Sequence, residues 1–244
     1  MAGASRPFSF MTIPMTDEPS HRQGAFFGRR KGHPLRAHQS ELLTTLLPRL
    51  AVDLSKPAQD PGALFPTPPD DIRLEIGFGG AEHLIAQALG DPRIGFIGCE
   101  PFVNGMAKAL AAIDAQKVGN IRLHHADAVD LLDWLPDNSL GRVDLLYPDP
   151  WPKRRHWKRR FVNTGNIARL ARVLRPGGEF RFATDWANYA EWTLLRLTQA
   201  REFAWTAERA DDWRKPWHGF TQTRYEAKAI REGRVPCYLV FRRV

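Results

Sequence analysis

The sequence IRLEIGFGGAE at residues 72–82 decides the fold class of this chain. Its aliphatic residues are typical of a buried β-strand, and the glycines at 77, 79 and 80 indicate a tight turn. A helical pattern follows through Leu89. A strand, a glycine turn and a helix in this order predict the first unit of an α/β sheet, with a ligand site beside the turn.

Apolar runs and helical patterns alternate along the rest of the chain. We expect further strands at 94–100, 121–127, a run ending at Asp149, 179–185, 203–207 and 237–242. Between them we expect helices at 102–117, 128–135, a stretch through 167–174 closed by Pro176-Gly177-Gly178, and 186–200. The alternation predicts an α/β fold with a doubly wound, mostly parallel seven-stranded sheet and helices on both faces.

Acidic residues fall at or next to the carboxyl ends of five predicted strands: Glu75, Glu100, Asp127, Asp149 and Asp185. Ligands of parallel sheets bind beyond these ends, so we expect the five side chains to converge. The G-x-G-x-x-G pattern is incomplete, because Glu82 stands at its third glycine, and carboxylates do not suit a pyrophosphate. They suit S-adenosylmethionine, with Glu100 accepting hydrogen bonds from the ribose and Asp127 facing the adenine.

A second stretch, VDLLYPDPWP at 143–152, precedes the basic run KRRHWKRR at 153–160. Two prolines stop the apolar run, so a strand is expected to end in the carboxylate of Asp149. Trp151 offers a flat face for a base, and six cations could hold phosphates: Lys153, Arg154, Arg155, Lys158, Arg159 and Arg160. Taken singly, these residues could be a loop carboxylate, a core tryptophan and a solvated helix. Together they predict chemistry on a nucleic acid.

The composition agrees with a polyanionic partner. The 244 residues include 35 Lys and Arg against 27 Asp and Glu, a net charge of +8. Cys99 and Cys237 are far apart and outside any metal-ligand pattern, which indicates reduced thiols, a cytoplasmic protein and no metal. No apolar run approaches the roughly 18 residues of a membrane helix, and residues 1–20 lack the apolar core of a signal peptide.

Three regions are expected along the chain. Residues 1–24 are unpatterned and predict a flexible tail. Residues 25–70 contain a basic arm at 26–36, a helix at 41–50 capped by Ser40, and a proline-rich linker at 57–69. The arm is either a nucleic-acid contact or a solvated segment. Residues 71–244 form the α/β domain.

Four motifs resemble the tRNA (guanine-N7-)-methyltransferase family: EIGFG at 75–79, PDPWPKRRH at 148–156, ATDW at 183–186 and TRYE at 223–226. The resemblance runs from about Phe27 to the end of the chain, and the second motif is the most specific. It implies a Rossmann-like class I methyltransferase that transfers a methyl group from S-adenosylmethionine to N7 of guanine 46 in the tRNA variable loop. We expect a monomer or homodimer that needs no further protein partner.

The resemblance also implies roles for individual residues. The cofactor site would be lined by Glu75, Gly77, Gly79, Glu100, Asp127 and Asp149, with Asp149 as the catalytic residue. The target would be bound by Lys153, Asp185, Thr223, Arg224, Tyr225 and Glu226, with the remaining cations of the 153–160 run on phosphates. One departure is Ala81, which stands where many relatives have a further glycine.

The chemistry of the residues agrees with this assignment. N7 of guanine carries an in-plane lone pair, so no base need remove a proton, and alignment and charge stabilisation are the main requirements. Asp149 can accept hydrogen bonds from the N1 and amino groups of the base as the ring becomes cationic. We expect His124 and His125 to be structural and His156 to be a phosphate or positioning contact. Two alternatives remain open: methylation of an exocyclic amine, and an RNA-binding module without a cofactor.

Overall fold

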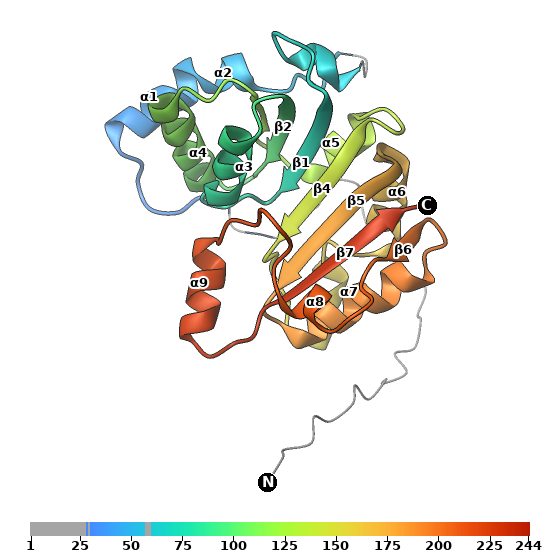
Figure 1. Ribbon diagram of the computed structural model, residues 1–244. Coiled ribbons are helices and arrows are strands. Elements are labelled where there is room, and N and C mark those ends of the chain that lie inside the picture. Colours follow the sequence, from blue (N-terminus) through green and yellow to red (C-terminus); the bar gives the residue numbers. More distant parts are fainter. Residues whose placement is uncertain (1–27, 29, 57–59) are drawn as a thin grey trace.

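The computed structural model describes residues 28, 30–56 and 60–244. The predicted tail at 1–24, residues 26, 27 and 29 of the basic arm and residues 57–59 of the predicted linker lie outside the described residues. Within the described part, seven strands form one sheet in the order β3-β2-β1-β4-β5-β7-β6 (Figure 1). β7 runs antiparallel to both of its neighbours, and the other pairs are parallel.

The strands are β1 (Asp71–Ile76), β2 (Ile94–Cys99), β3 (Ile121–His124), β4 (Leu140–Leu146), β5 (Leu174–Thr184), β6 (Phe203–Trp205) and β7 (Cys237–Arg243). The α-helices are α1 (Ala37–Thr45), α2 (Leu47–Leu50), α3 (Glu82–Gly90), α4 (Val103–Gln116), α5 (Ala128–Trp134), α6 (Thr164–Val173), α7 (Ala187–Gln199), α8 (Asp211–Arg214) and α9 (Arg224–Arg231). Two short 3-10 helices are η1 (Pro61–Leu64) and η2 (Arg154–Arg159).

Helices cover both faces of the sheet (Figure 1). α1, α3 and α4 pack on one face, where they share an apolar cluster with residues of β2 and β3. α5, α6 and α7 pack on the opposite face, over the larger cluster that includes β1, β4 and β5. The predicted α/β fold, with helices on both faces of a mostly parallel seven-stranded sheet, is therefore confirmed.

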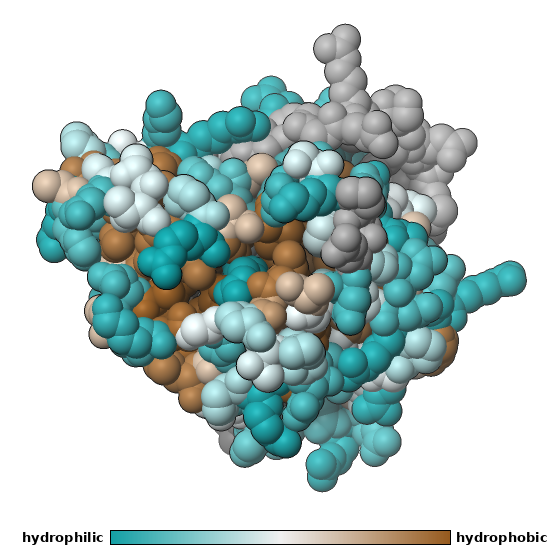
Figure 2. Space-filling model, turned by 90° about the horizontal axis from the view of Figure 1, so that it is seen from above, coloured by the Kyte–Doolittle hydropathy of each residue, from teal (hydrophilic) through white to brown (hydrophobic). Residues whose placement is uncertain are grey.

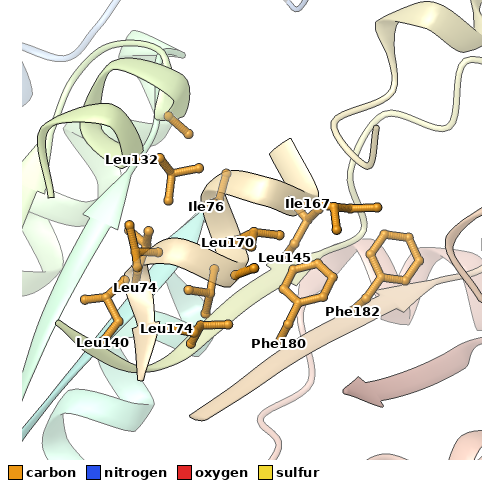
Figure 3. Close-up of a cluster of buried hydrophobic side chains, with 14 of the residues drawn as sticks. Leu74, Ile76, Leu132, Leu140, Leu145, Ile167, Leu170, Leu174, Phe180 and Phe182 are labelled. Atoms are coloured by element: carbon orange, nitrogen blue, oxygen red, sulfur yellow. The ribbon is translucent and has the colours of Figure 1, made fainter. Parts of the chain in front are cut away.

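The larger core is made by alternate residues of the central strands, as the period of two requires. Side chains from β1, β4, β5, α5 and α6 converge there (Figure 3), among them Leu74, Ile76, Leu132, Leu145, Ile167, Leu170, Phe180 and Phe182. Burial of one such side chain stabilises the fold by about 1.5–3 kcal/mol. This packing holds β1 and β4 side by side and so brings their carboxyl ends together.

The opposite face of the same strands carries a buried polar layer beneath α3. Nε of Arg142 donates to Asp144 at 2.8 Å, and Nη2 of Arg142 donates to Gln87 of α3 at 2.8 Å. Nδ1 of His83 lies 2.8 Å from a carboxylate oxygen of Glu75. Because these charges are buried, their mutual pairing is what makes the layer tolerable in the core.

Strand β4 ends earlier than the sequence predicts. Its last residue is Leu146, and the next residue, Tyr147, has a φ of 51°. Positive φ turns the chain out of the sheet, and Pro148 and Pro150 have no amide hydrogen to continue the ladder. Asp149 therefore lies on a loop beyond the strand instead of at its end.

The N-terminal region also differs from expectation. The predicted helix at 41–50 is divided into α1 and α2, because Pro48 cannot continue the hydrogen bonding of α1. α1 begins at Ala37 after Arg36, so Ser40 lies inside the helix and does not cap it. The described part of the predicted linker, 60–69, contains η1 and the buried Phe65, which packs on the β2 backbone at Gly95.

The strands β1, β4 and β5 point downward in Figure 1, so that their carboxyl ends face the side where α9 lies. The view from above shows hydrophilic residues around a hollow in which hydrophobic residues gather (Figure 2). Among the described residues, no helix combines the length and the apolarity that crossing a membrane would require. The candidate site is built at the carboxyl ends of these strands, on the side opposite the view of Figure 2.

Candidate active site

The turn after β1 is built from residues with positive φ. Gly77 and Gly79 have φ angles of 70° and 57°, and Ala81, at the start of α3, has a φ of 65°. Glycine adopts this region freely, whereas an L-residue loses roughly 1–2 kcal/mol there, so alanine is a strained choice at position 81. A Cβ added to Gly77 would meet nothing within 4 Å. The turn thus borders space that a ligand can occupy.

Glu100 joins the end of β2 to this turn. Its Oε2 accepts a hydrogen bond from Gly79 N at 2.7 Å, and its Oε1 accepts one from Phe102 N at 2.9 Å. Burial raises the pKa of the Glu100 carboxyl despite these two amide donors. Each oxygen retains a further lone pair, so the carboxylate can accept hydrogen bonds from a ligand as well.

Two other predicted cofactor residues have structural partners at this edge. Asp127 caps α5, since its side chain accepts a hydrogen bond from Val129 N at 3.0 Å. Glu75 is buried in the polar layer, where it pairs with His83. Their part in cofactor binding stays a prediction, and it must be compatible with these contacts.

The loop after β4 exposes the predicted catalytic carboxylate. Asp149 lies between two residues with positive φ, Tyr147 at 51° and Trp151 at 44°. Such backbone strain persists only where the surrounding structure holds it, and it is common at functional sites. Asp149 reaches solvent, yet the protein around it removes enough water to raise the pKa of its carboxyl. The guanidinium of Arg159 lies over the Trp151 ring, 4.9 Å from its centre, so one face of that ring is covered.

The TRYE motif forms the start of α9 and lies against the glycine turn. Thr223 caps the helix, since its hydroxyl accepts a hydrogen bond from Glu226 N at 3.2 Å. A Cβ at Gly79 would lie 3.0 Å from the ring of Tyr225. Arg224 stacks on that ring at 5.1 Å and approaches Glu82 at 3.9 Å. Segments almost 150 residues apart in sequence therefore meet at the turn.

Two further carboxylates of the predicted target site are already engaged. Asp185, at the end of β5, forms an ion pair with Arg234. Glu226 is buried and accepts a hydrogen bond from the Tyr238 hydroxyl. Burial, together with the nearby Tyr238 and Glu226, raises the pKa of Tyr147. The start of α9 is thus tied to β7 by the bond between Glu226 and Tyr238.

The run at 153–160 divides into two parts. Lys153, Arg154, Arg155 and Lys158 are exposed, as phosphate contacts would need to be. Arg160 is 2 % exposed, so its prediction as a phosphate contact is wrong. Its side chain turns inward among aromatic rings at the end of η2. From here on, residues 153–159 are called the basic segment.

Comparison with known proteins decides the family. The family model described as "Putative methyltransferase" matches residues 70–238. The "tRNA (guanine-N(7)-)-methyltransferase" of Rhodopseudomonas palustris (strain BisB5) is 61% identical over 229 residues, which cover 93% of this chain and 90% of that protein. The protein of the same name from Nitrobacter hamburgensis is 61% identical over 223 residues, 91% of this chain and 87% of that protein.

The chain belongs to the tRNA (guanine-N(7)-)-methyltransferase family.

A solved structure agrees with the fold of this family member. The 16S rRNA methyltransferase KamB superposes with a TM-score of 0.53 at 17% identity, over 72% of this chain and 89% of KamB. At that identity the likeness concerns the fold alone, the Rossmann-like class I methyltransferase sheet. In the described part of the chain, His, Cys, Asp and Glu side chains form no group that could hold a metal ion.

Several residues that shape the site of this tRNA (guanine-N(7)-)-methyltransferase family member were not predicted from sequence. Arg142 and Asp144 could have been found, because their spacing of two in an apolar run puts both on one buried face. No pattern among neighbouring residues in the sequence predicts the contacts of His83 and Arg234 or the burial of Arg160. Their partners come from other elements, and only the folded chain brings them together.

Proposed function

We propose that the protein transfers a methyl group from S-adenosylmethionine to N7 of guanine 46 in the variable loop of tRNA. Family membership supports the methylation of guanine N7 in tRNA. The position of that guanine, 46, is the part that we add. One observation carries the proposal. The loop after β4 presents Asp149 at the carboxyl edge, next to the turn after β1 and ahead of the exposed basic segment.

The residues at the glycine turn fit S-adenosylmethionine, which supplies the methyl group. The cofactor has a sulfonium, an ammonium and no phosphate, so it suits an edge that carries carboxylates. We assign Glu100 to the ribose hydroxyls and Asp127 to the adenine end. Gly77 and Gly79 leave the backbone open to the ligand, and Glu75 and Asp149 add negative charge nearby.

Asp149 would act on the guanine and not as a base. N7 has a lone pair in the ring plane, so the protein needs only to hold it in line with the methyl group. A fixed carboxylate that accepts hydrogen bonds from the opposite edge of the base favours the positive charge that grows on the purine. Lys153, Asp185 and the TRYE residues 223–226 would complete the contacts to the target nucleotide.

The exposed Arg154, Arg155 and Lys158 of the basic segment would neutralise tRNA phosphates, together with the partly buried Arg159. The described part of the basic arm, residues 30–36, would extend this surface. Asn104 of α4 clamps it, because its side chain accepts from Gly32 N at 2.7 Å and donates to His33 O at 2.8 Å. A Cβ at Gly32 would lie 2.8 Å from Oδ1 of Asn104 and 2.9 Å from the ring of Phe102, so a larger residue would have to displace these side chains. Lys31, which is exposed beside it, would then face the RNA.

The two cysteines bear on the compartment in which the protein acts. Cys99 is buried and Cys237 is partly buried, and burial raises the pKa of the Cys237 thiol to about 11. Thiols of this kind are unreactive and suit a cytoplasmic protein. We propose that the enzyme acts there as a monomer or homodimer.

Methylation of defined transcripts tests the proposal. The protein is incubated with methyl-labelled S-adenosylmethionine and tRNA, and the labelled nucleoside is identified after digestion. We expect N7-methylguanosine, with loss of the label when guanine 46 is replaced by adenine. Label in an exocyclic amine, or at another guanine, would contradict the proposal. Calorimetry that shows no binding of the cofactor would point instead to an RNA-binding module.

A further inference from the structure

The last arginine of the 153–160 run is in the core and contacts the catalytic loop. Nε of Arg160 donates a hydrogen bond to the carbonyl oxygen of Pro150 at 2.9 Å. Its Nη2 donates to the side-chain oxygen of Asn188 at 2.8 Å, and its Nη1 to the Asn188 carbonyl at 3.5 Å. One guanidinium therefore links the loop after β4 to the first turn of α7.

Three aromatic rings enclose this guanidinium. Its central carbon lies 4.9 Å from the ring centre of Trp157, 4.7 Å from that of Tyr189 and 5.0 Å from that of Trp192. Trp192 is itself fixed, because its indole N–H donates to Val162 O at 2.6 Å. Arginine, with a planar and weakly hydrated head group, suits such a cage better than lysine does.

Within the described part of the chain, the caged cation has no paired anion. Among the described residues, no carboxylate forms an ion pair with Arg160. Burial lowers the pKa of Arg160 to about 10, so the group is still charged at neutral pH. A buried charge that is satisfied only by carbonyl, amide and aromatic groups is unfavourable for stability compared with an apolar side chain. The placement of Arg160 therefore indicates that it holds neighbouring backbone in position.

The loop that Arg160 contacts needs such support. Residues Tyr147 and Trp151 at its ends both have positive φ, and Pro148 and Pro150 have no amide hydrogen to donate. The amide of Tyr147 holds the start of the segment by donating to Ala183 O at 2.8 Å, and the Pro150 carbonyl provides an attachment further along. The Pro150 carbonyl lies one residue beyond Asp149, so a bond to it restrains the backbone next to the catalytic residue.

We propose that Arg160 is a positioning residue that fixes the Asp149 carboxylate by holding the Pro150 carbonyl. This rests on the proposed function, in which Asp149 contacts the guanine. Arg160 thus differs from its neighbours in the basic segment, which meet RNA from the outside. Without it, the strained loop relaxes and Asp149 leaves the position that the reaction needs.

Salt dependence separates this role from phosphate binding. In Arg160→Met, an apolar side chain of similar length fills the cage. We expect tRNA affinity and the slope of log affinity against log salt concentration to match those of the parent protein. In the matched control, Arg155→Met, we expect the slope to fall by about 1, because one exposed phosphate contact is lost. An equal loss of slope in Arg160→Met would overturn the proposal.

A double-mutant cycle tests whether Arg160 acts through Asp149. At saturating tRNA and cofactor, Arg160→Met should slow single-turnover methyl transfer on the order of 10²-fold, as expected for a misplaced catalytic group. Combined with Asp149→Asn, it should add little further loss, since the group that it positions is already inactive. Additive losses would show that Arg160 acts elsewhere. An inactive parent protein would instead refute the proposed function.

Asn188→Ala provides a milder variant if Arg160→Met does not fold. It removes the side-chain acceptor of Nη2 and leaves the charge in place, and thermal unfolding checks that the protein remains native. We expect slower transfer with unchanged salt slope and cofactor affinity. Transfer at the parental rate by a folded Asn188→Ala would contradict the positioning role.

Discussion

Asp149 shows how the protein sets the state of one carboxyl group. Its neighbours remove water from it, which raises its pKa above the ordinary value of 3.8. The proposed role needs the charged form. The rate should therefore be high above the raised pKa and should fall as the pH drops through it.

We predict that Asp149→Asn lowers the rate of methyl transfer on the order of 10²-fold or more, because a preorganised charge beside the purine is lost. Single-turnover transfer at saturating tRNA and cofactor measures this. The acid limb of the pH–rate profile that belongs to Asp149 should also disappear in the variant. Transfer by Asp149→Asn at close to the parental rate would make charge at this position irrelevant, and Asp185 would be tested next.

Glu100 has a double role that the structure makes testable. It accepts hydrogen bonds from Gly79 and Phe102, and we assign its remaining lone pairs to the cofactor. Glu100→Ala should weaken cofactor binding by roughly 1.5–3 kcal/mol, the usual loss for a charged acceptor, and should spare tRNA binding. Calorimetry with S-adenosylmethionine measures it. Equal cofactor affinity in parent and variant would remove Glu100 from the site.

Among the elements, η2 and its flanks carry the strongest positive charge beside the site. We predict that Arg154→Glu with Arg155→Glu reduces tRNA affinity and the salt slope, since each lost phosphate contact lowers the slope by about 0.9. Titrations of labelled tRNA at several salt concentrations measure both quantities. The cofactor should bind as before.

A control with the same change in net charge lies at the opposite edge of the sheet. Arg93 precedes β2 and Lys117 ends α4, and both are highly exposed. Arg93→Glu with Lys117→Glu alters long-range attraction equally but touches no proposed contact. If both double variants lose affinity to the same degree, the basic segment contributes only its overall charge.

Local patterns explain what could be predicted about these elements. Seven strands and the main helices follow from short-range periodicity, which depends on neighbours within about four residues. The end of β4 could not be predicted from sequence. Tyr147 has a positive φ, and a tyrosine side chain gives no indication of such a backbone angle. α9 was recognised only as a motif, and its contact with Gly79 depends on how β7 returns along β5.

At the scale of the whole molecule, the sequence identifies charged residues but does not show which of them the fold buries. Arg154 and Arg160 are alike in the sequence, six positions apart, yet one is exposed and the other is enclosed by rings from η2 and α7. The sequence likewise does not show that the polar layer is buried, since α3, β1 and β4 each supply part of it. Such burial depends on contacts between distant segments, which a single sequence does not specify.

The polar layer makes global stability depend on pH. Burial alone would lower the pKa of His83, but the carboxylate of Glu75, supported by Asp144 and opposed by Arg142, raises it above 6.5. A histidine with a raised pKa in the folded state stabilises the fold fully below its unfolded value and loses that contribution as pH rises through the folded value. The free energy of unfolding should therefore fall as pH increases from about 6.5.

We predict that His83→Gln abolishes this part of the fall, because glutamine can still donate to Glu75 but cannot take up a proton. Urea unfolding of parent and variant from about pH 6 to pH 9 measures the difference, which isolates His83 from other groups that titrate in both proteins. At low pH the variant should be the less stable of the two, and the curves should converge as pH rises. Parallel curves over this range would show that folding does not shift the pKa of His83. A parent curve that rises relative to that of the variant would show that His83 is neutral in the folded protein and that its contact with Glu75 is a neutral hydrogen bond.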